Sequence, residues 1–320
     1  MAELTYSHSG GKLQTLIEIF SKEFAQLGIS ASPKIIEALS ITVHKAMTGK
    51  SRLYHSLDHA FDLLDPDDPF QSIAALYHDL VHYHVDLGYS PEIEQGIFPY
   101  LTSRSEPVTL IEDVPAGDEV FLLTLSVFGF RPGQVLDPDC GLNEFISALF
   151  MNLQLQPYLD TAALLRITVC VEATIPFREQ GYFYTLADRV SAVNMSLGVG
   201  LRADEIFDTI KAAVTFANRD VKDFADPELS VLINNTWLLL PEQNLALRKG
   251  IYTTGEYCQA LLKVEEFLGS LRVETIFHQF EDTPALDVYL QMLRFARANL
   301  SAALNYLQIK LISAVVLNAL

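Results

Sequence analysis

Residues 54–62 read Tyr-His-Ser-Leu-Asp-His-Ala-Phe-Asp, and residues 77–82 read Tyr-His-Asp-Leu-Val-His. With His84, these two stretches hold five of the eight histidines of a 320-residue chain, and carboxylates lie between them. Chance rarely gathers histidines so closely in a chain that contains so few. Imidazole and carboxylate groups together suit Mn, Fe, Ni, Zn or Mg. The two stretches therefore indicate a metal site.

The spacing of these histidines predicts two helices. His55 and His59 are four residues apart, and His78 and His82 repeat the spacing, so each pair would share one face of a helix. The turn at residues 65–69 separates them and contains an aspartate suited to cap the second helix, followed by a proline suited to its first position. Two helices joined by a short turn pack antiparallel. We expect both histidine faces to point into one cleft and His84 to point away from it.

The rest of the chain also has helical periodicity. Apolar residues recur every three or four positions in 13–27, 257–271 and 300–315. Pro33 is suited to open a helix, and Thr253 with Glu256 forms the pattern of a capping box. Alternating strand patterns are scarce, and the best of them, residues 120–128, is equally compatible with a buried helix. The sequence predicts an all-α fold.

We expect residues 1–320 to form a single, mainly helical domain. Residues 1–50 would supply N-terminal helices, residues 51–195 the metal-site core, and residues 196–320 a helical C-terminal extension of unknown role. The apolar stripe of the last helix needs a partner helix, either within the fold or across a homodimer. The apolar stretch at 312–320 is too short to cross a bilayer and is expected in the core.

The composition of the chain narrows the range of possible binding partners. The chain has 22 basic and 40 acidic side chains, a formal net charge of −18, so a nucleic acid would be repelled. A small phosphorylated substrate held by a local metal remains compatible with this charge. The three cysteines form no C-x-x-C pattern, and the N-terminus lacks the order of a signal peptide. We expect a cytoplasmic protein without membrane contact.

The histidine-rich stretches resemble a known family. His78-Asp79 with an upstream histidine is similar to the H…HD…D signature of HD-domain metal-dependent phosphohydrolases, an all-helical superfamily. Residues 51–84 resemble the motifs of cyclic-nucleotide phosphodiesterases and of small HD hydrolases. Ser56 stands where the family usually has Asn, and no C-terminal glutamine motif is present. The resemblance therefore extends to the superfamily rather than to a cyclic-nucleotide substrate.

The resemblance implies roles for five residues. It implies that His59, His78 and Asp79 bind one or two divalent metal ions, with Asp79 able to bridge a second ion. It implies that His55 is the acid that protonates the leaving oxygen, and that His82 supports the site or contacts a second metal. No other cofactor is implied.

The resemblance also requires a downstream aspartate ligand. Leu186-Ala187-Asp188 follows residues 172–175, and both fragments look like family elements in the right order, so Asp188 is the first choice. Asp220 is the second. Arg178, which follows Phe177, is a candidate to hold a substrate phosphate, or else an ordinary surface cation.

The function expected from these features is a metal-dependent phosphohydrolase or phosphodiesterase. It would cleave a phosphoester of a small, nucleotide-like molecule by metal-activated water, with His55 donating a proton to the departing oxygen. One alternative is an HD-type di-iron oxygenase. Another is a catalytically inactive HD fold that acts as a ligand sensor or interaction scaffold.

Overall fold

The computed structural model describes residues 11–103 and 107–319. The structure is 69% helical, and its described residues form 16 α-helices and no strand. The predicted all-α fold is confirmed. Residues 120–128, for which a strand was the alternative, lie within a helix. The N-terminal residues 1–10, on which the expectation of no signal peptide was based, lie outside the described residues.

The helices follow one another in a simple order along the chain. Their bounds are α1 Gly11–Gln26, α2 Pro33–Met47, α3 Leu57–Asp62, α4 Pro69–Tyr77, α5 Tyr83–Asp86, α6 Pro91–Ile97, α7 Glu119–Phe128, α8 Leu142–Leu155, α9 Thr161–Ala173, α10 Tyr182–Ser196, α11 Ala203–Asp220, α12 Leu229–Gln243, α13 Leu245–Arg248, α14 Thr254–Ser270, α15 Val273–Ile276 and α16 Leu286–Ala319. Three short 3₁₀ helices, η2 Phe98–Tyr100, η3 Pro138–Cys140 and η4 Lys222–Ala225, join some of them.

Local sequence signals account for several helix starts. The Asp68 carboxylate accepts hydrogen bonds from the backbone N–H groups of the first turn of α4, as the turn at residues 65–69 predicted. At α14, the Thr253 hydroxyl accepts from the Glu256 N–H at 3.2 Å, while the Glu256 carboxylate accepts from the Thr253 N–H at 2.7 Å. Each arrangement pairs backbone donors that a helix start otherwise leaves exposed. These helix starts are therefore encoded by neighbouring residues.

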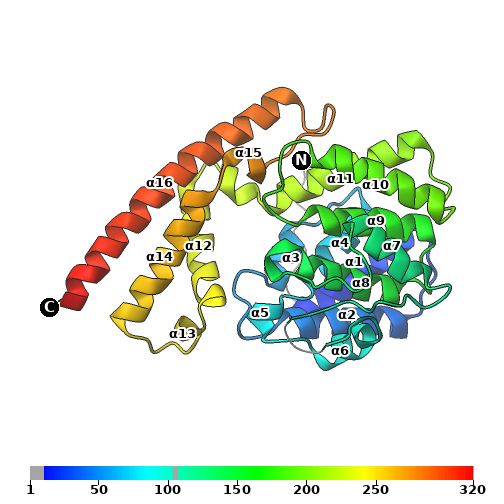
Figure 1. Ribbon diagram of the computed structural model, residues 1–320, viewed down its shortest axis with the longest axis horizontal. Coiled ribbons are helices and arrows are strands. Elements are labelled where there is room, and N and C mark those ends of the chain that lie inside the picture. Colours follow the sequence, from blue (N-terminus) through cyan, green and yellow to red (C-terminus); the bar gives the residue numbers. More distant parts are fainter. Residues whose placement is uncertain (1–10, 104–106, 320) are drawn as a thin grey trace.

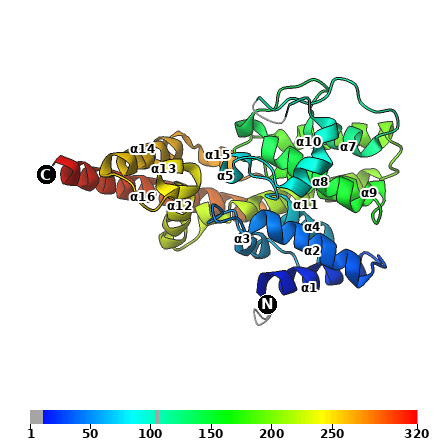
Figure 2. The same cartoon turned by 90° about the horizontal axis from the view of Figure 1, so that it is seen from below.

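The helices gather into two lobes. The larger lobe consists of α1–α11, packed around buried apolar residues between Leu16 and Ala217. The smaller lobe consists of α12–α16, with its own buried apolar residues between Leu232 and Leu307. Figure 1 shows the smaller lobe as an arm beside the larger one, and Figure 2 shows the same separation from below. Residues of both lobes line one cavity.

Polar and aromatic contacts fix the smaller lobe to the larger one. The Asn218 amide, on α11, donates to the His278 carbonyl at 2.8 Å and accepts from the His278 N–H at 2.9 Å. Phe280, just beyond, packs against Tyr184 and Phe207 of the larger lobe. Buried hydrogen bonds of this kind are costly to break. The segment between α15 and α16 thus holds the arm in place.

The last helix departs from expectation. α16 packs on α14, but near its C-terminal end Ile309, Ile312 and Leu317 are more than half exposed. The prediction that the apolar stretch from 312 belongs to the core is wrong, because the helix runs past the end of its partner (Figure 1). α16 has 34 residues and is long and apolar enough to cross a membrane, with 22% of its most apolar window buried. The length argument against a membrane span does not hold for this helix.

Candidate metal centre

The two histidine-bearing stretches meet, although not as two helical faces. His59 lies on α3, whereas His55 precedes that helix. His78 immediately follows the last residue of α4, and His82 immediately precedes the first residue of α5. The expectation that each pair shares one face of one helix is wrong, because the chain leaves helical geometry at both places. The four imidazoles nevertheless line one cavity.

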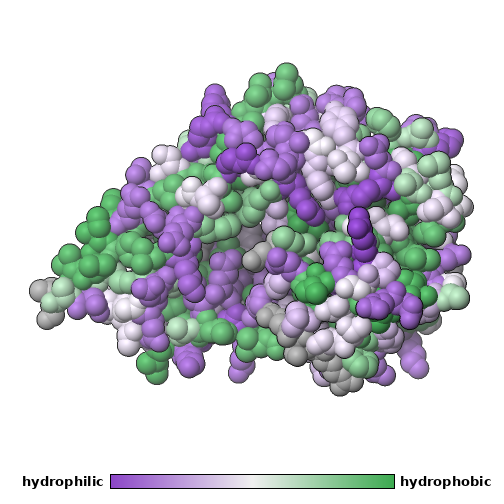
Figure 3. Space-filling view, viewed as in Figure 1, coloured by the Kyte–Doolittle hydropathy of each residue, from purple (hydrophilic) through white to green (hydrophobic). Residues whose placement is uncertain are grey.

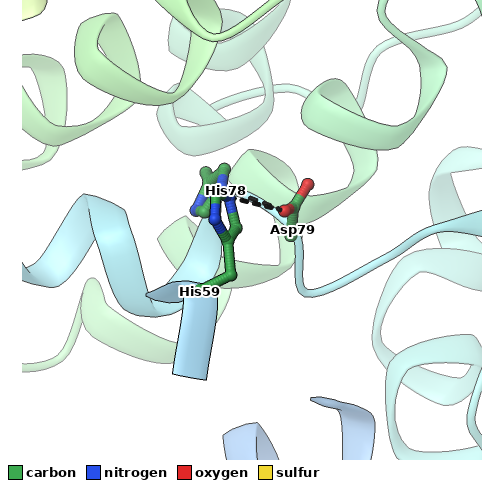
Figure 4. Close-up of side chains that lie close together, drawn as sticks. All are labelled: His59, His78 and Asp79. Carbon is green, nitrogen blue, oxygen red and sulfur yellow. Dashed lines mark ion pairs between the residues drawn. The ribbon is translucent and has the colours of Figure 1, made fainter. Parts of the chain in front are cut away.

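A group of potential metal ligands lies at one side of this cavity. One ligand atom each from His59, His78 and Asp79 lie within 4.8 Å of one another. Oδ2 of Asp79 is 3.0 Å from Nε2 of His78 and 3.7 Å from Nε2 of His59. Figure 4 shows the three side chains pointing toward one another. This is the trio that the resemblance implied.

Of the two candidate aspartates, Asp220 lies beside the trio and Asp188 does not. Oδ1 of Asp220 lies 3.0 Å from Nε2 of His59 and 3.6 Å from Nε2 of His78. Asp188 is exposed on α10 and does not line the cavity. The first choice between the two aspartates is therefore corrected. Asp220 is the last residue of α11. The helical turn before it is buried, and there the Phe216 ring packs against the His78 ring, which brings Asp220 to the site.

The protonation of His78 is set by the backbone. Its Nδ1 lies 2.9 Å from the carbonyl oxygen of Ala75, which can only accept, so Nδ1 carries a proton and donates. In neutral His78, Nε2 then presents a lone pair toward the two carboxylates. That buried nitrogen has no hydrogen-bond partner of good geometry. A lone pair that faces anionic oxygens is unfavourable, so Nε2 either takes up a proton, which the raised pKa of His78 favours despite burial, or meets a cation. Backbone carbonyls that accept from the other ring nitrogen orient metal-binding histidines in general.

The carboxylates are ionised at neutral pH. Burial alone would raise the pKa of Asp79, but the nearby His78 and His55 outweigh it and hold this pKa well below its usual value. Burial opposes ionisation of Asp220 as well, yet hydrogen bonds with His59 and His78 lower its pKa to about 2. The donor set is thus two imidazole nitrogens and two carboxylate oxygens. Such a set fits a divalent cation.

His55 is held by a residue that the sequence analysis missed. Its Nδ1 lies 2.7 Å from Oε2 of Glu242, a fully buried carboxylate on α12. The other oxygen of Glu242 accepts from the backbone N–H groups of Leu53, of Tyr54 at 2.7 Å and of His55 at 3.2 Å. Burial lowers the pKa of His55, but Asp79 and Glu242 outweigh this and raise it above its usual value. His55 is therefore ready to hold a proton.

His82 is a neutral partner of His55. The two rings lie 4.5 Å apart between centroids. Burial, with the adjacent His55, lowers the pKa of His82 to about 3, and its buried Nδ1 has no hydrogen-bond partner. His84, in contrast, is exposed, as expected from its place in the sequence. His82 contacts the proposed acid rather than joining the ligand trio.

A buried arginine connects the two histidine-bearing stretches. The Arg52 guanidinium donates to Asp86 at 2.9 Å and to the Leu80 carbonyl at 3.1 Å. It also donates to the backbone carbonyls of His55 and Asp79. Each donor is fixed by the planar shape of the group, so one side chain sets the relative position of both stretches. Arg52 holds the loops that carry the site.

The residues that sequence reasoning overlooked had weak signals. Glu242 ends the apolar run that begins at Trp237, and a lone acid at such a place is a clue to burial with a partner. Glu144 lines the cavity from α8, and burial raises its pKa to about 7. Arg178, which the sequence did suggest as a candidate to hold a substrate phosphate, instead lies beside Glu172, at 3.6 Å, and the ring of Tyr182, and is not among the cavity-lining residues. None of these contacts follows from local spacing.

Comparison of the chain with protein-family models, with curated proteins and with solved structures found no match. The arrangement of side chains is therefore the basis on which a function is proposed.

Proposed function

We propose that this protein is a metal-dependent hydrolase of the HD type that cleaves a phosphoester of a small molecule. The observation that carries the proposal is the convergence of His59, His78, Asp79 and Asp220 beside His55. Metal-assisted hydrolysis needs metal ligands and a proton donor close together, and this cavity has both on one wall.

The four converging groups fit a divalent cation. His78 has a lone pair oriented by Ala75, and both aspartates are ionised. Bound there, one or two ions of Mn, Mg, Fe, Ni or Zn would acidify a water molecule and neutralise charge on phosphoryl oxygens. His59 and Asp220 complete the set from α3 and α11.

His55 supplies the proton for the leaving oxygen. Glu242 accepts the Nδ1 proton, so the Nε2 proton of the imidazolium is the one available for transfer. Asp79 and Glu242 stabilise the protonated form before the transfer. His82, kept neutral, packs beside the ring without competing for that proton. We therefore propose that His82 contributes to catalysis only by packing beside His55, and not by transferring a proton itself.

The test pairs metal analysis with a substrate panel. Protein purified without chelators is analysed for bound elements, and phosphomonoesters and diesters are offered with each of the five metals. Asp79→Ala should abolish hydrolysis and metal retention, whereas Asp188→Ala, an exposed acid, should change neither. Absence of any hydrolysis by wild type with every metal would reject the proposal.

Two other functions are outcomes of the same experiment. Co-purified iron with a mixed-valent signal would favour the di-iron oxygenase, for which the extra imidazoles of His55 and His82 beside the trio offer further ligands. Protein without metal, in which His78→Ala changes neither stability nor any hydrolysis, would favour an inactive sensor or scaffold.

The binding partners and the cellular location of the protein remain predictions. The net charge of −18 supports the exclusion of nucleic acid and the choice of a small phosphorylated substrate. The exposed apolar residues on α16 support self-association through the C-terminal helices, although a membrane contact would use the same surface. A cytoplasmic location is proposed from the cysteine pattern alone.

A further inference from the structure

The cavity extends beyond the ligand group. It has a volume of about 540 Å³, and cavities of roughly 300–1,000 Å³ hold drug-sized ligands. A phosphoryl group beside the ligand atoms would occupy only a part of it. The cavity lies where the two lobes meet, and Figure 3 shows the surface hollowed between them. Most of its volume is therefore available to the rest of the substrate.

One part of the cavity lining is an apolar wall that comes mainly from the smaller lobe. It is formed by Phe177, Phe224, Leu232, Leu239, Phe267 and Leu268. The Phe177 ring meets the Phe267 ring edge to face at 5.6 Å and the Phe224 ring at 6.4 Å. Phe267 keeps 38% of its surface exposed, so apolar area remains to be covered. An apolar ligand group would cover it favourably.

The charges of the lining disfavour a second anionic group. No lysine or arginine is found among the described lining residues, whereas four carboxylates are, on Asp79, Glu144, Asp220 and Asp223. A diphosphate or triphosphate would place further negative charge near these acids without a lysine or arginine to balance it, because the proposed His55 imidazolium serves the leaving oxygen of the reacting phosphoryl group. The part of the substrate beyond the reacting phosphoryl group is therefore uncharged.

Two polar side chains near the apolar wall are already engaged as donors. Asn235 donates to Asp223, and the Thr236 hydroxyl donates to the Leu232 carbonyl at 2.8 Å. A nucleobase placed against this wall would leave its ring nitrogens and exocyclic groups without these two partners, which is costly. A hydrocarbon group requires none.

We propose that the substrate is a phosphoester of an apolar alcohol, with the phosphoryl group at the histidine–aspartate cluster and the alcohol against α12, α14 and Phe177. This inference rests on the proposed hydrolase function, and it assigns a role to the C-terminal extension. The smaller lobe forms the specificity pocket, while the larger lobe holds the reacting groups.

The test uses two matched series. Ethyl, butyl, hexyl and octyl phosphates, as monoesters and as methyl diesters, are compared with a nucleoside monophosphate for kcat/KM in the presence of Mn²⁺. The corresponding alkylphosphonates, which are not hydrolysed, are titrated by calorimetry into the Mn²⁺-loaded protein. Burial of each methylene should raise both kcat/KM and affinity roughly fourfold until the wall is covered.

Substitutions in the apolar wall test which of its residues contact the alcohol. Leu239→Ala and Phe267→Ala should each reduce the octyl-to-ethyl ratio several-fold, in turnover and in phosphonate binding. Leu238→Ala, the exposed neighbour on α12, is the matched control and should leave the ratio unchanged. Circular dichroism and thermal unfolding of each variant establish that it is folded.

The outcomes separate the two proposals. Chain-length-dependent phosphonate binding without hydrolysis of any ester would reject the hydrolase and retain the apolar site. Hydrolysis that ignores chain length, or a preference for the nucleoside monophosphate that Phe267→Ala does not alter, would overturn the apolar site and retain the hydrolase. Failure of both readouts would reject both.

Discussion

Oε2 of Glu242, on α12, lies 2.7 Å from Nδ1 of His55, although 187 positions separate the two residues in the chain. The same carboxylate accepts from three successive backbone N–H groups at residues 53–55. The smaller lobe thus orients the proposed acid of the larger lobe. A chain truncated before α12 would lose this contact.

Glu242→Gln tests the orientation of His55. The amide can still accept from the backbone but carries no charge to stabilise the imidazolium. We expect kcat to fall about 100-fold, within the range that general acids contribute. The acid works when protonated, so activity falls as pH rises through the His55 pKa, and the variant should move that fall to lower pH. A pH–rate profile measures both effects. Glu228→Gln, an exposed acid at the start of α12, is the control; an unmoved profile in Glu242→Gln would contradict the role.

Asp220→Ala tests the corrected ligand assignment. The substitution removes one of the two carboxylates of the proposed donor set. Mutating a residue that only hydrogen-bonds to a metal ligand typically weakens metal binding by about 10- to 100-fold, so losing a ligand should weaken Mn²⁺ binding by at least that much. Asp188→Ala should bind as wild type does, since that acid is exposed. Calorimetric titration compares the two variants. The reverse pattern would restore Asp188 as the ligand.

The metal-free protein should lose stability as pH rises. The folded pKa of His78 is raised, so pairing with Asp79 and Asp220 stabilises the fold fully below its ordinary value of 6.5 and is lost as pH rises through the folded pKa. Asp220 acts oppositely: its contribution is present above the ordinary 3.8 and is lost as pH falls toward about 2. Thermal unfolding of chelator-treated protein should therefore show Tm falling as pH rises above 6.5 and through the folded pKa of His78.

Added Mn²⁺ should reverse this trend, because metal binding requires deprotonated imidazole and strengthens as pH rises. The comparison of the two Tm profiles is the measurement. Identical profiles with and without Mn²⁺ would show that Mn²⁺ does not bind the folded protein preferentially.

Arg52→Met removes the buried clamp between the histidine-bearing stretches. Removal of one partner from a buried ion pair leaves the Asp86 charge uncompensated and costs about 3–5 kcal/mol. Urea unfolding at neutral pH measures the loss. Arg202→Met breaks an exposed pair with Asp204, which solvent screens, and should leave the unfolding midpoint nearly unchanged. Equal losses in the two variants would show that the clamp does not stabilise the fold.

Ile312→Glu combined with Val316→Glu tests the exposed end of α16. Both residues are more than half exposed, so the fold should keep its Tm within the small range typical of surface substitutions. If the helix self-associates, wild type should show a dimer mass by light scattering and the variant a monomer mass. A wild type that is monomeric at all concentrations would contradict the homodimer, and retention on neutral lipid vesicles would point to a membrane surface instead.

Local sequence determined the capped helix starts and the closeness of His59, His78 and Asp79 along the chain, but not the shared helical faces that the histidine spacing predicted. The Asp68 cap and the Thr253–Glu256 capping box act over three residues, so their geometry follows from the chain itself. Asp79 follows His78 directly, and His59 lies one short helix and one turn away. Residues so close in sequence meet with little loss of chain entropy, which is why a motif reveals them.

Only the tertiary structure decided which distant residues complete the site. Asp188 and Asp220 both lie on helices near the expected place, but the packing of α10 turns one outward while the buried face of α11 brings the other to His59. Glu242 reaches His55 because the smaller lobe docks on the larger one through Asn218 and Phe280. Such contacts depend on how separate helices pack, and packing depends on the shape and apolar surface of the whole chain rather than on any one stretch of it.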